Sequence, residues 1–346
     1  MSSLSRIVIK GFKSIQEVDL SLTNFNVLIG ANGVGKSNLI AFVKMLHAIL
    51  QKELQLYVAQ KGGIDAFLHY GTQKTAILSA NLYVGSNSYY FDLEATPENK
   101  FIFLKESLQC QNRTAISLVR KHTESIMPNL LEENDHKKLA HSIISNIKRC
   151  AIYHLDNTSD MANIKRLHAI YDNVKLRHDG GNLAAFLYKL QNTSPKHYET
   201  LCNTIQQVVP FFGDFHLKPF PKNPQTIQLE WTEKGGYYPF TANELSDGTL
   251  RFICFATLLL QPHVPATMFI DEPELGLPPH AISILASLLR EASNRCQLIV
   301  STQSWNLVQT FNAENIIVVE KEDGQSVFRR LEENQLKSWL EKYRFF

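Results

Sequence analysis

The residues best suited to chemistry lie in one short stretch at 30–37, which reads Gly-Ala-Asn-Gly-Val-Gly-Lys-Ser. The spacing Gly-x-x-x-x-Gly-Lys-Ser is typical of a phosphate-binding P-loop. An apolar run at 25–29 precedes it and predicts a buried strand, and apolar residues recur every three to four positions after it, as in a helix. Successive backbone N–H groups at such a junction form an anion site, to which the helix N-terminus adds its positive dipole end. We therefore expect this stretch to bind nucleotide phosphates, and the flanks disfavour a chance match in an unrelated fold.

Each residue type in the loop has a physical role. Gly33 and Gly35 permit backbone conformations and close approach that a Cβ would hinder. Lys36 would neutralise the β- and γ-phosphates, and the Ser37 hydroxyl would ligate Mg²⁺. The residues predicted to bind the nucleotide are contiguous: Asn32, Gly33, Val34, Gly35, Lys36, Ser37 and Asn38.

A pair of carboxylates ends another apolar run, Met-Phe-Ile-Asp-Glu-Pro at 268–273. Asp271 stands where a carboxylate would hold Mg²⁺, through water or through Ser37. Glu272 would orient and activate an attacking water, whereas its alternative role is to cap the next helix. A kinase or a small GTPase has no need of this second carboxylate, so the pair favours an ATPase.

Two further stretches lie within about 30 positions of Asp271 on either side. Ser246 and Gly248 lie 25 and 23 positions before it, at the start of an apolar helix predicted at 250–260. They predict a second anion site, and the alternative is an ordinary N-cap serine followed by a turn glycine. Gln303 follows an apolar strand 32 positions after Asp271. That spacing would place Gln303 at the carboxyl end of a neighbouring strand, beside the phosphates.

The composition limits the class of protein. Among 346 residues, 35 Lys and Arg oppose 33 Asp and Glu, which gives a net charge of +2. DNA binding is therefore not indicated by whole-chain charge, and any basic patch must be local. Five scattered cysteines without a Cys-x-x-Cys pair indicate reduced thiols in a cytoplasmic protein and no zinc site. The longest apolar run, 252–260, is far shorter than the ~20 residues that span a bilayer, so we expect no membrane association.

The pattern of the chain predicts three parts. Residues 1–97 are expected to form the N-terminal part of an ATPase domain and contain the P-loop, with paired strands expected at 4–10 with 15–22 and at 75–84 with 89–94. Residues 98–205 form a mainly helical insertion, in which 98–178 carry 13 Lys and Arg against 9 Asp and Glu. A solvated helical face is the preferred interpretation of that weak excess, and the alternative is a docking face for nucleic acid or a partner. Residues 206–346 alternate strands with helices, which predicts a parallel sheet.

The elements expected in the last part are a hairpin at 226–231 and 237–240, strands at 267–270, 297–301 and 315–319, and helices at 250–260, 281–291 and 304–310. Within the insertion, a strand is expected at 150–155 and a helix at 183–190. His154 lies within that strand, and Asp156 and Asp160 follow it. The spacing of these three residues matches no metal-binding pattern, and capping by Asp156 is preferred.

Together these motifs resemble the ABC-type ATPase heads of the SMC/RecF-like group. Within it, they are similar to small bacterial AAA-type ATPases related to RecF and to the ATPase part of overcoming-lysogenisation nucleases. Three further stretches carry the resemblance: Ile-Lys-Gly-Phe-Lys-Ser-Ile at 9–15, Leu-Ser-Asp-Gly-Thr-Leu-Arg-Phe at 245–252 and Asp-Glu-Pro-Glu-Leu-Gly-Leu-Pro-Pro at 271–279. The resemblance covers nearly the whole chain. It implies an α/β fold, a P-loop NTPase of the ABC-head type with a mixed sheet, an antiparallel N-terminal lobe and a mainly helical insertion.

The resemblance also assigns roles to residues. It implies ATP and Mg²⁺ as cofactors, with Ser37 and Asp271 on the metal and Glu272 as general base. Ser246 and Gly248 would contact the γ-phosphate bound to a second subunit, and the loop 274–277 would cross the dimer interface. Lys13 and Ser14 would lie near the nucleotide, and Gln60 and Gln73 both remain open as the Q-loop residue.

Two departures from the family pattern bear on function. Many ABC ATPases have His where this chain has Gln303, and an amide can orient water but cannot take up a proton near pH 7. We therefore expect slow hydrolysis. The chain also reaches Phe346 without room for an acidic, metal-binding Toprim domain. A nuclease coupled to it is expected to be a separate protein.

The expected function is ATP hydrolysis by a nucleotide-sandwich homodimer that is coupled to DNA or to a separate effector protein, in phage defence or DNA maintenance. The alternative is a nucleotide-gated scaffold or sensor that regulates an effector with little turnover. Glu272 favours at least slow turnover. A transporter subunit is disfavoured, because the small lobe and the insertion do not suit docking on membrane helices.

Overall fold

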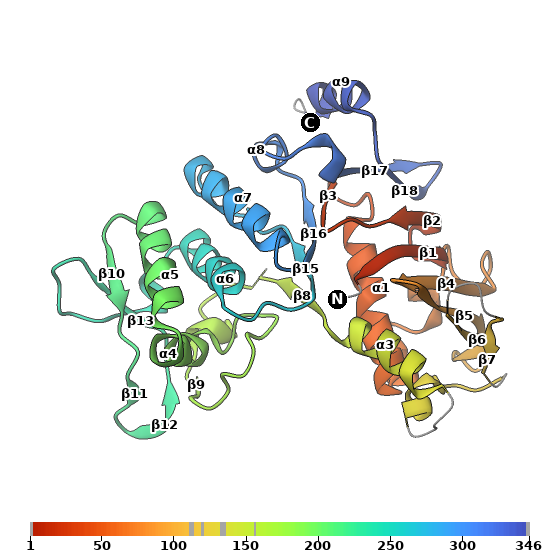
Figure 1. Ribbon diagram of the computed structural model, residues 1–346, viewed down its shortest axis with the longest axis horizontal. Helices are drawn as coiled ribbons and strands as arrows, with labels where there is room; N and C mark the ends of the chain where they lie inside the picture. The colour runs from red at the N-terminus through yellow and green to blue at the C-terminus, as the bar shows by residue number, and fades with distance from the viewer. Residues whose placement is uncertain (1–2, 111–113, 119–120, 132–135, 156, 344–346) are drawn as a thin grey trace. The chain divides into compact units, whose positions relative to one another are not determined.

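The computed structural model describes residues 3–110, 114–118, 121–131, 136–155 and 157–343 (Figure 1). The chain folds into two compact units. The first combines Met1–Ala151 with Ala313–Phe346, and the second is Ile152–Asn312. The antiparallel sheet of the first unit continues beyond residue 98, and the expected divisions at 97/98 and 205/206 remain predictions. No helix in the described ranges is long and apolar enough to cross a membrane.

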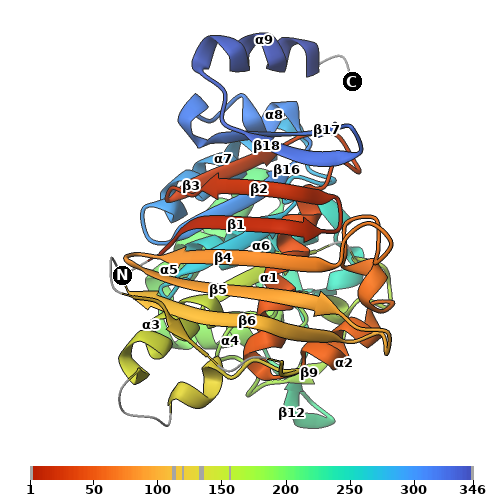
Figure 2. The same ribbon diagram turned by 90° about the vertical axis from the view of Figure 1, so that its right-hand side faces the viewer.

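An antiparallel sheet dominates the first unit, in the order β2-β1-β4-β5-β6-β7. Its strands are β1 (Leu4–Phe12), β2 (Ile15–Ser21), β4 (Ile77–Val84), β5 (Asn87–Ala95), β6 (Phe101–Cys110) and β7 (Ile116–Ser117). Buried residues alternate with more exposed ones along β4, as expected for a strand with one covered face. Figure 2 shows the sheet in front of its helices α1 (Lys36–Gln51), α2 (Leu54–Gln60) and α3 (Lys137–Lys148). The expected antiparallel lobe is thus confirmed.

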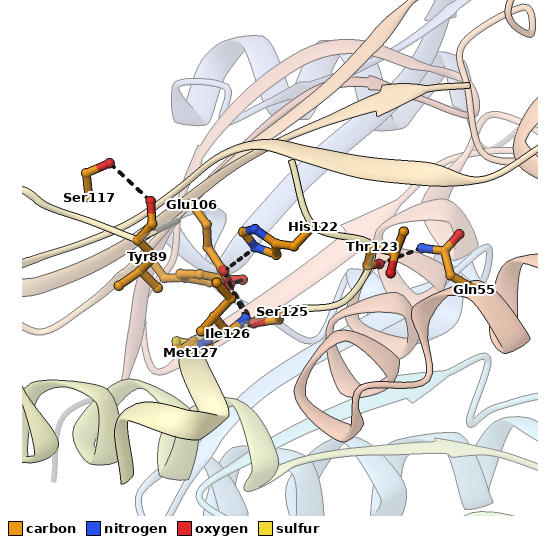
Figure 3. Close-up of polar contacts among 10 residues, drawn as sticks. Gln55, Tyr89, Glu106, Ser117, His122, Thr123, Ser125, Ile126 and Met127 are labelled. Carbon is orange, nitrogen blue, oxygen red and sulfur yellow. Dashed lines mark hydrogen bonds and ion pairs between the residues drawn. The ribbon is translucent and has the colours of Figure 1, made fainter. Parts of the chain in front are cut away.

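Strand β6 lies where the sequence predicts a mainly helical insertion. Charged residues at 105 and 106 interrupt its run of apolar residues, yet Glu106 is only 1% exposed. Figure 3 shows why this charge is tolerated: Glu106 accepts hydrogen bonds from Tyr89 Oη at 2.7 Å, His122 Nε2 at 3.0 Å and the Ile126 N–H at 3.0 Å. Tertiary partners from 122–126 therefore allow an inward-facing carboxylate, and no local pattern reveals them. Among the described residues of 98–205, α-helices are α3, α4 (Leu183–Thr193) and most of α5 (Pro195–Val208).

The strand that leads into the P-loop is β3 (Phe25–Ile29), and all of its residues are buried. It runs parallel to β17 (Ile316–Glu322), which pairs in antiparallel fashion with β18 (Gln325–Arg329). The last helix, α9 (Glu333–Tyr343), buries Leu336 and Leu340. Residues from the end of the chain thus flank the strand before the P-loop.

The second unit contains the expected parallel strand pair. Strands β15 (Thr267–Asp271) and β16 (Gln297–Thr302) are parallel, with Asp271 paired to Ser301. They are joined through α7 (Pro279–Ser293), and the buried helix α6 (Asp247–Leu260) packs against α5 and α7. The short helix α8 (Trp305–Val308) follows β16. Strand β8 (Cys150–His154) leads from the first unit into the second.

Two small sheets complete the second unit. One has the order β10-β13-β14, from Phe212–Phe215, Glu230–Glu233 and Phe240–Thr241. The other has the order β11-β12-β9, from Pro219–Phe220, Asn223–Ile227 and His168–Ala169. The hairpin expected at 226–231 and 237–240 is confirmed only in part, because the paired strands are β13 and β14, whereas Asn223–Ile227 pairs with β11 and β9. Short 3-10 turns lie at Ile64–Ala66, Met127–Leu131, Asn163–Lys165, Ala242–Glu244 and Ala313–Asn315.

Candidate functional site

The backbone of the P-loop requires glycine at specific points. Gly35 has φ 108° directly before α1, and Gly33 has φ +79°. A Cβ at Gly35 would lie 2.0 Å from Ser326 Oγ, and one at Gly30 would lie 2.2 Å from the carbonyl oxygen of Val319. Gly33 is thus needed for its conformation, Gly30 for close packing and Gly35 for both.

Lys36 begins α1 and is only 4% exposed. Its Nζ donates to the carbonyl oxygens of Gly30 at 2.6 Å and Ala31 at 3.0 Å. The first turn of α1 has no acidic residue to oppose a bound anion. The ammonium group and the helix N-terminus therefore give this loop a positive character that suits phosphate.

A cluster of short polar side chains supports the P-loop from behind. Ser326 Oγ donates to the Val34 carbonyl oxygen at 2.5 Å, and its N–H donates to the Ser14 carbonyl oxygen at 2.7 Å. The hydroxyls of Ser14 and Ser326 share a hydrogen bond, and Asn38 Nδ2 donates to Ser14 Oγ at 2.6 Å. Ser326 lies on β18 and is 1% exposed, and no sequence motif indicates its role. Its role follows from the pairing of β17 and β18 beside β3.

A cavity of about 620 Å³ lies beside α1. Its walls include Lys13, Asn38, Asp65, Tyr70 and Gln73. Burial lowers the pKa of Lys13, and the nearby charge of Lys61 adds to this effect. Lys13 and Gln73 therefore line the same cavity as Asn38 of α1. Gln73 is one of the two candidates for the Q-loop residue. Gln60, the other candidate, ends α2 and is not part of its lining.

Asp271 is the last residue of β15 and is 7% exposed. The Ser301 hydroxyl donates to its Oδ1, and His154 Nδ1 lies 3.4 Å from its Oδ2. His154 thus faces the candidate metal ligand, a contact that the spacing of the chain did not predict. Asp160 instead lies 3.8 Å from Lys165 Nζ, and Asp156 falls outside the described residues. No group of three potential His, Cys, Asp or Glu ligands gathers in the part of the chain that the structure describes.

Glu272 has an unusual backbone. Its φ is +44°, a left-handed conformation that is strained for glutamate, and its N–H donates to the Ser301 carbonyl oxygen at 2.9 Å. Two residues further on, Glu274 is 6% exposed and accepts a hydrogen bond from the Thr302 hydroxyl. Burial raises the pKa of Glu274, and the charge of Glu272 adds to this effect. Thr302 and Glu274 are therefore site neighbours that sequence reasoning did not single out in these roles.

Ser246 and Gly248, which we call the signature residues, lie at the N-terminus of α6. Ser246 is the N-cap residue of α6, and its Oγ accepts a hydrogen bond from the Thr249 N–H at 3.1 Å, as in the alternative interpretation. A Cβ at Gly248 would lie 2.1 Å from the carbonyl oxygen of Gly276. Arg251 is 8% exposed and Nη1 donates to the Leu275 carbonyl oxygen at 3.2 Å. The start of α6 and the loop 274–277 therefore form one packed structure.

Gln303 follows β16 and is half-buried. Asp271 pairs with Ser301 on the parallel neighbour, so Glu272 and Gln303 both stand just beyond the carboxyl ends of adjacent strands. The structure thereby brings Asp271, Glu272 and Gln303 to one edge of the sheet in the second unit. The residues of the P-loop belong to the first unit.

A family model matches residues 25–309, and the chain belongs to that family, described as "AAA domain, putative AbiEii toxin, Type IV TA system". The Old nuclease of Escherichia phage P2 is 24% identical over 94% of this chain and 61% of that protein. The DNA replication and repair protein RecF of Cronobacter sakazakii is 38% identical over 71 residues, 20% of each chain. The chain thus spans about three fifths of the length of the phage relative.

Solved structures support the same fold. The SmcHead bound to the C-winged helix domain of ScpA superposes with a TM-score of 0.61 at 16% identity, over 97% of this chain and 99% of that chain. The Smc head domain from Pyrococcus furiosus bound to the C-terminal domain of ScpA gives a TM-score of 0.57 at 16% identity, over 99% and 100%. The protein therefore carries an SMC/RecF-like, ABC-type ATPase fold, as its motifs predict.

Proposed function

We propose that this chain, as a member of that AAA family, binds ATP with Mg²⁺ and hydrolyses it slowly. The observation that supports this most directly is the P-loop itself, with buried Lys36 and an acid-free helix N-terminus. The cavity beside it, with Tyr70 and Asp65 in its wall, has a volume typical of small-molecule sites and would take the nucleoside.

The oxygen donors present suit Mg²⁺, which prefers carboxylates, hydroxyls and water. Ser37 and Asp271 would hold the ion, and when bound it would neutralise charge on the phosphates. The carboxylate of Asp271 is nearly buried and kept in place by Ser301, which suits a metal ligand. His154 would fix the other oxygen of that carboxylate.

Glu272 would accept the proton of the attacking water, because it is the carboxylate next to Asp271 and its backbone is held in a strained conformation. Gln303, just after the adjacent strand β16, would orient that water through its amide. Since an amide cannot take up the proton, turnover would depend on Glu272 alone.

We further propose that ATP closes a homodimer, in which Ser246 and Gly248 of each chain contact the γ-phosphate held by the other. The signature is part of a rigid surface, because Gly248 packs against Gly276 and Arg251 holds the loop 274–277. An interface built on two copies of one surface would give a closed, two-fold assembly.

The proposed output of the dimer is control of a separate effector protein or of DNA, in phage defence or DNA maintenance. The curated relatives named as a nuclease and as a DNA replication and repair protein support this direction. The five free cysteines suit a reducing cytoplasm. The second candidate function is a nucleotide-gated regulator with little turnover, and the amide of Gln303 favours it.

The test is ATP binding and phosphate release by the purified full chain. Lys36→Ala should abolish tight binding of a fluorescent ATP analogue, whereas Lys44→Ala, an exposed lysine on the same helix, should not change it. Equal affinity of the wild type and Lys36→Ala would contradict the P-loop assignment. Magnesium-dependent phosphate release that Glu272→Gln does not lower would contradict the assigned base.

A further inference from the structure

One long connection in the second unit exposes large apolar side chains. Between β8 and α4, Met161 is 70% exposed, Leu167 43%, Tyr171 76% and Val174 82%. Such a concentration within 14 positions is unusual for a protein surface, because each group would gain free energy by leaving water. Clusters of this kind commonly mark interaction sites.

The backbone that presents these side chains is firmly held. Asn182, which is 0% exposed, accepts from the Arg177 N–H at 2.8 Å through Oδ1. Its Nδ2 donates to the carbonyl oxygens of Asp172 at 2.8 Å and Lys175 at 2.9 Å. Lys189 Nζ adds a bond to the Asn173 carbonyl oxygen at 3.2 Å. Tyr171 and Val174 therefore project from an ordered segment, which reduces the entropy lost when a partner binds.

A small sheet brings a second segment beside this connection. In β9, His168 pairs with Ile227 and Ala169 with Thr226, and Pro219 of β11 pairs with Ile227 on the other side. The Ile170 N–H also donates to the Gln225 carbonyl oxygen at 2.9 Å. Figure 1 shows β9, β11 and β12 grouped together in the second unit. Residues 216–229 thus lie next to the exposed connection although they follow it by some 50 positions.

The second segment carries positive charges alone, whereas the connection carries both signs, with Asp160 beside Lys165 and Asp172 beside Arg177. Residues 216–229 contain Lys218 and Lys222, both exposed, and no Asp or Glu. Arg166 and Lys175 are exposed on the connection itself. None of these four cations forms an ion pair with a described residue. The neighbouring Arg177, by contrast, pairs with Asp172 at 2.7 Å.

We infer that this surface docks a partner protein that presents Asp and Glu side chains around an apolar anchor. The docking surface consists of Met161, Arg166, Leu167, Tyr171, Val174, Lys175, Lys218 and Lys222. Three of its four apolar groups are aliphatic or thioether chains, which offer no ring face for stacking on nucleic-acid bases. An apolar centre with a charged rim is instead the anatomy of a protein interface. The inference rests on the proposed control of an effector. Its test needs no ATP, so a negative result would contradict the docking surface without bearing on ATP binding.

The experiment uses the purified full chain and a displayed library of random 16-residue peptides. Peptides are selected on the wild type and counter-selected on the Tyr171→Ser/Val174→Ser variant. We expect the enriched peptides to combine Asp or Glu with Leu, Phe or Trp. In fluorescence anisotropy, their affinity should fall at least tenfold in that variant and also fall in Lys175→Glu/Lys218→Glu. Tyr237→Ser, at a position that is 97% exposed but outside the docking surface, should leave it unchanged.

Three results would overturn the inference. The first is the absence of peptides that depend on Tyr171 and Val174. The second is enrichment of basic peptides. The third is binding of a 20-base-pair duplex or a 20-nucleotide single strand that the same variants abolish, which would make the surface a nucleic-acid site. Circular dichroism and thermal unfolding show whether each variant is folded, and Asn182→Ala, which leaves the exposed groups in place, should weaken binding by loosening the segment.

Discussion

Ser326 is predicted to act on ATP binding although it has no place in any phosphate-binding motif. Ser326→Ala removes the hydrogen bond from its hydroxyl to the Val34 carbonyl oxygen and the one shared with Ser14. Each neutral hydrogen bond contributes about 0.5–1.5 kcal/mol, so the two together predict a loss of about 1–3 kcal/mol in the free energy of unfolding. The bond to Val34 alone acts on the loop. Its loss should weaken ATP binding by about 2- to 13-fold.

Titration with a fluorescent ATP analogue and thermal unfolding measure the two effects. Ser338→Ala is the matched control, because Ser338 is an exposed serine that bonds only within α9. A double-mutant cycle with Ser14→Ala sharpens the test, since the two hydroxyls share one bond and their effects should not add. Unchanged ATP affinity in Ser326→Ala, or strictly additive effects in the cycle, would refute the supporting role of this cluster.

Three other changes have defined outcomes. Glu272→Gln should bind ATP normally but hydrolyse it about 10²- to 10⁴-fold more slowly, and light scattering with ATP and Mg²⁺ should then show a doubled mass. Gln303→His should raise kcat at pH 7–8 with nearly unchanged ATP affinity, and a fall in kcat would show that the water-activating residues are wrongly assigned. Because burial raises the folded-state pKa of Glu274, the protonated form is favoured in the folded protein, and stability is lost as pH rises from about 4.5 through that raised pKa. Denaturant unfolding at pH 5 and pH 8 should show that Glu274→Gln removes this loss, and the same pH dependence in both proteins would contradict it.

Local patterns predicted the elements that carry the phosphate chemistry. The apolar run at 25–29, the glycines after it and the 3–4-residue spacing that follows are all contiguous, so strand, loop and helix could be located together. The same holds for β15 and β16, whose apolar runs end in polar residues. Both strands are entirely buried, as their composition indicates.

What could not be predicted depends on residues that meet only in the folded chain. Ser326 contacts Val34 of the P-loop although the two residues are some 300 positions apart in the sequence, because strand pairing brings them together. The sequence does not indicate strand β6, because Glu106 faces inward and its hydrogen-bond partners are Tyr89, His122 and Ile126. The sequence places His154 near Asp156 and Asp160, whereas in the folded chain it lies against Asp271, far along the chain. In each case a side chain's partner, rather than its own type, decides its role.

The docking surface and the signature helix share contacts that give them a physical connection. Lys165 has a side chain only 5% exposed, and its Nζ lies 3.9 Å from Asp247 in the first turn of α6. Arg251, one turn further along α6, donates through Nε to the Leu155 carbonyl oxygen at 2.7 Å, where the exposed connection begins. Movement of the α6 N-terminus would therefore act on both ends of the segment that precedes Leu167 and Tyr171. By linkage, any such coupling is reciprocal: a partner that binds the docking surface more tightly in one state of α6 must favour that state to the same degree. ATP binding at a dimer interface and effector binding at the docking surface would thus both depend on the position of α6, and each would affect the other.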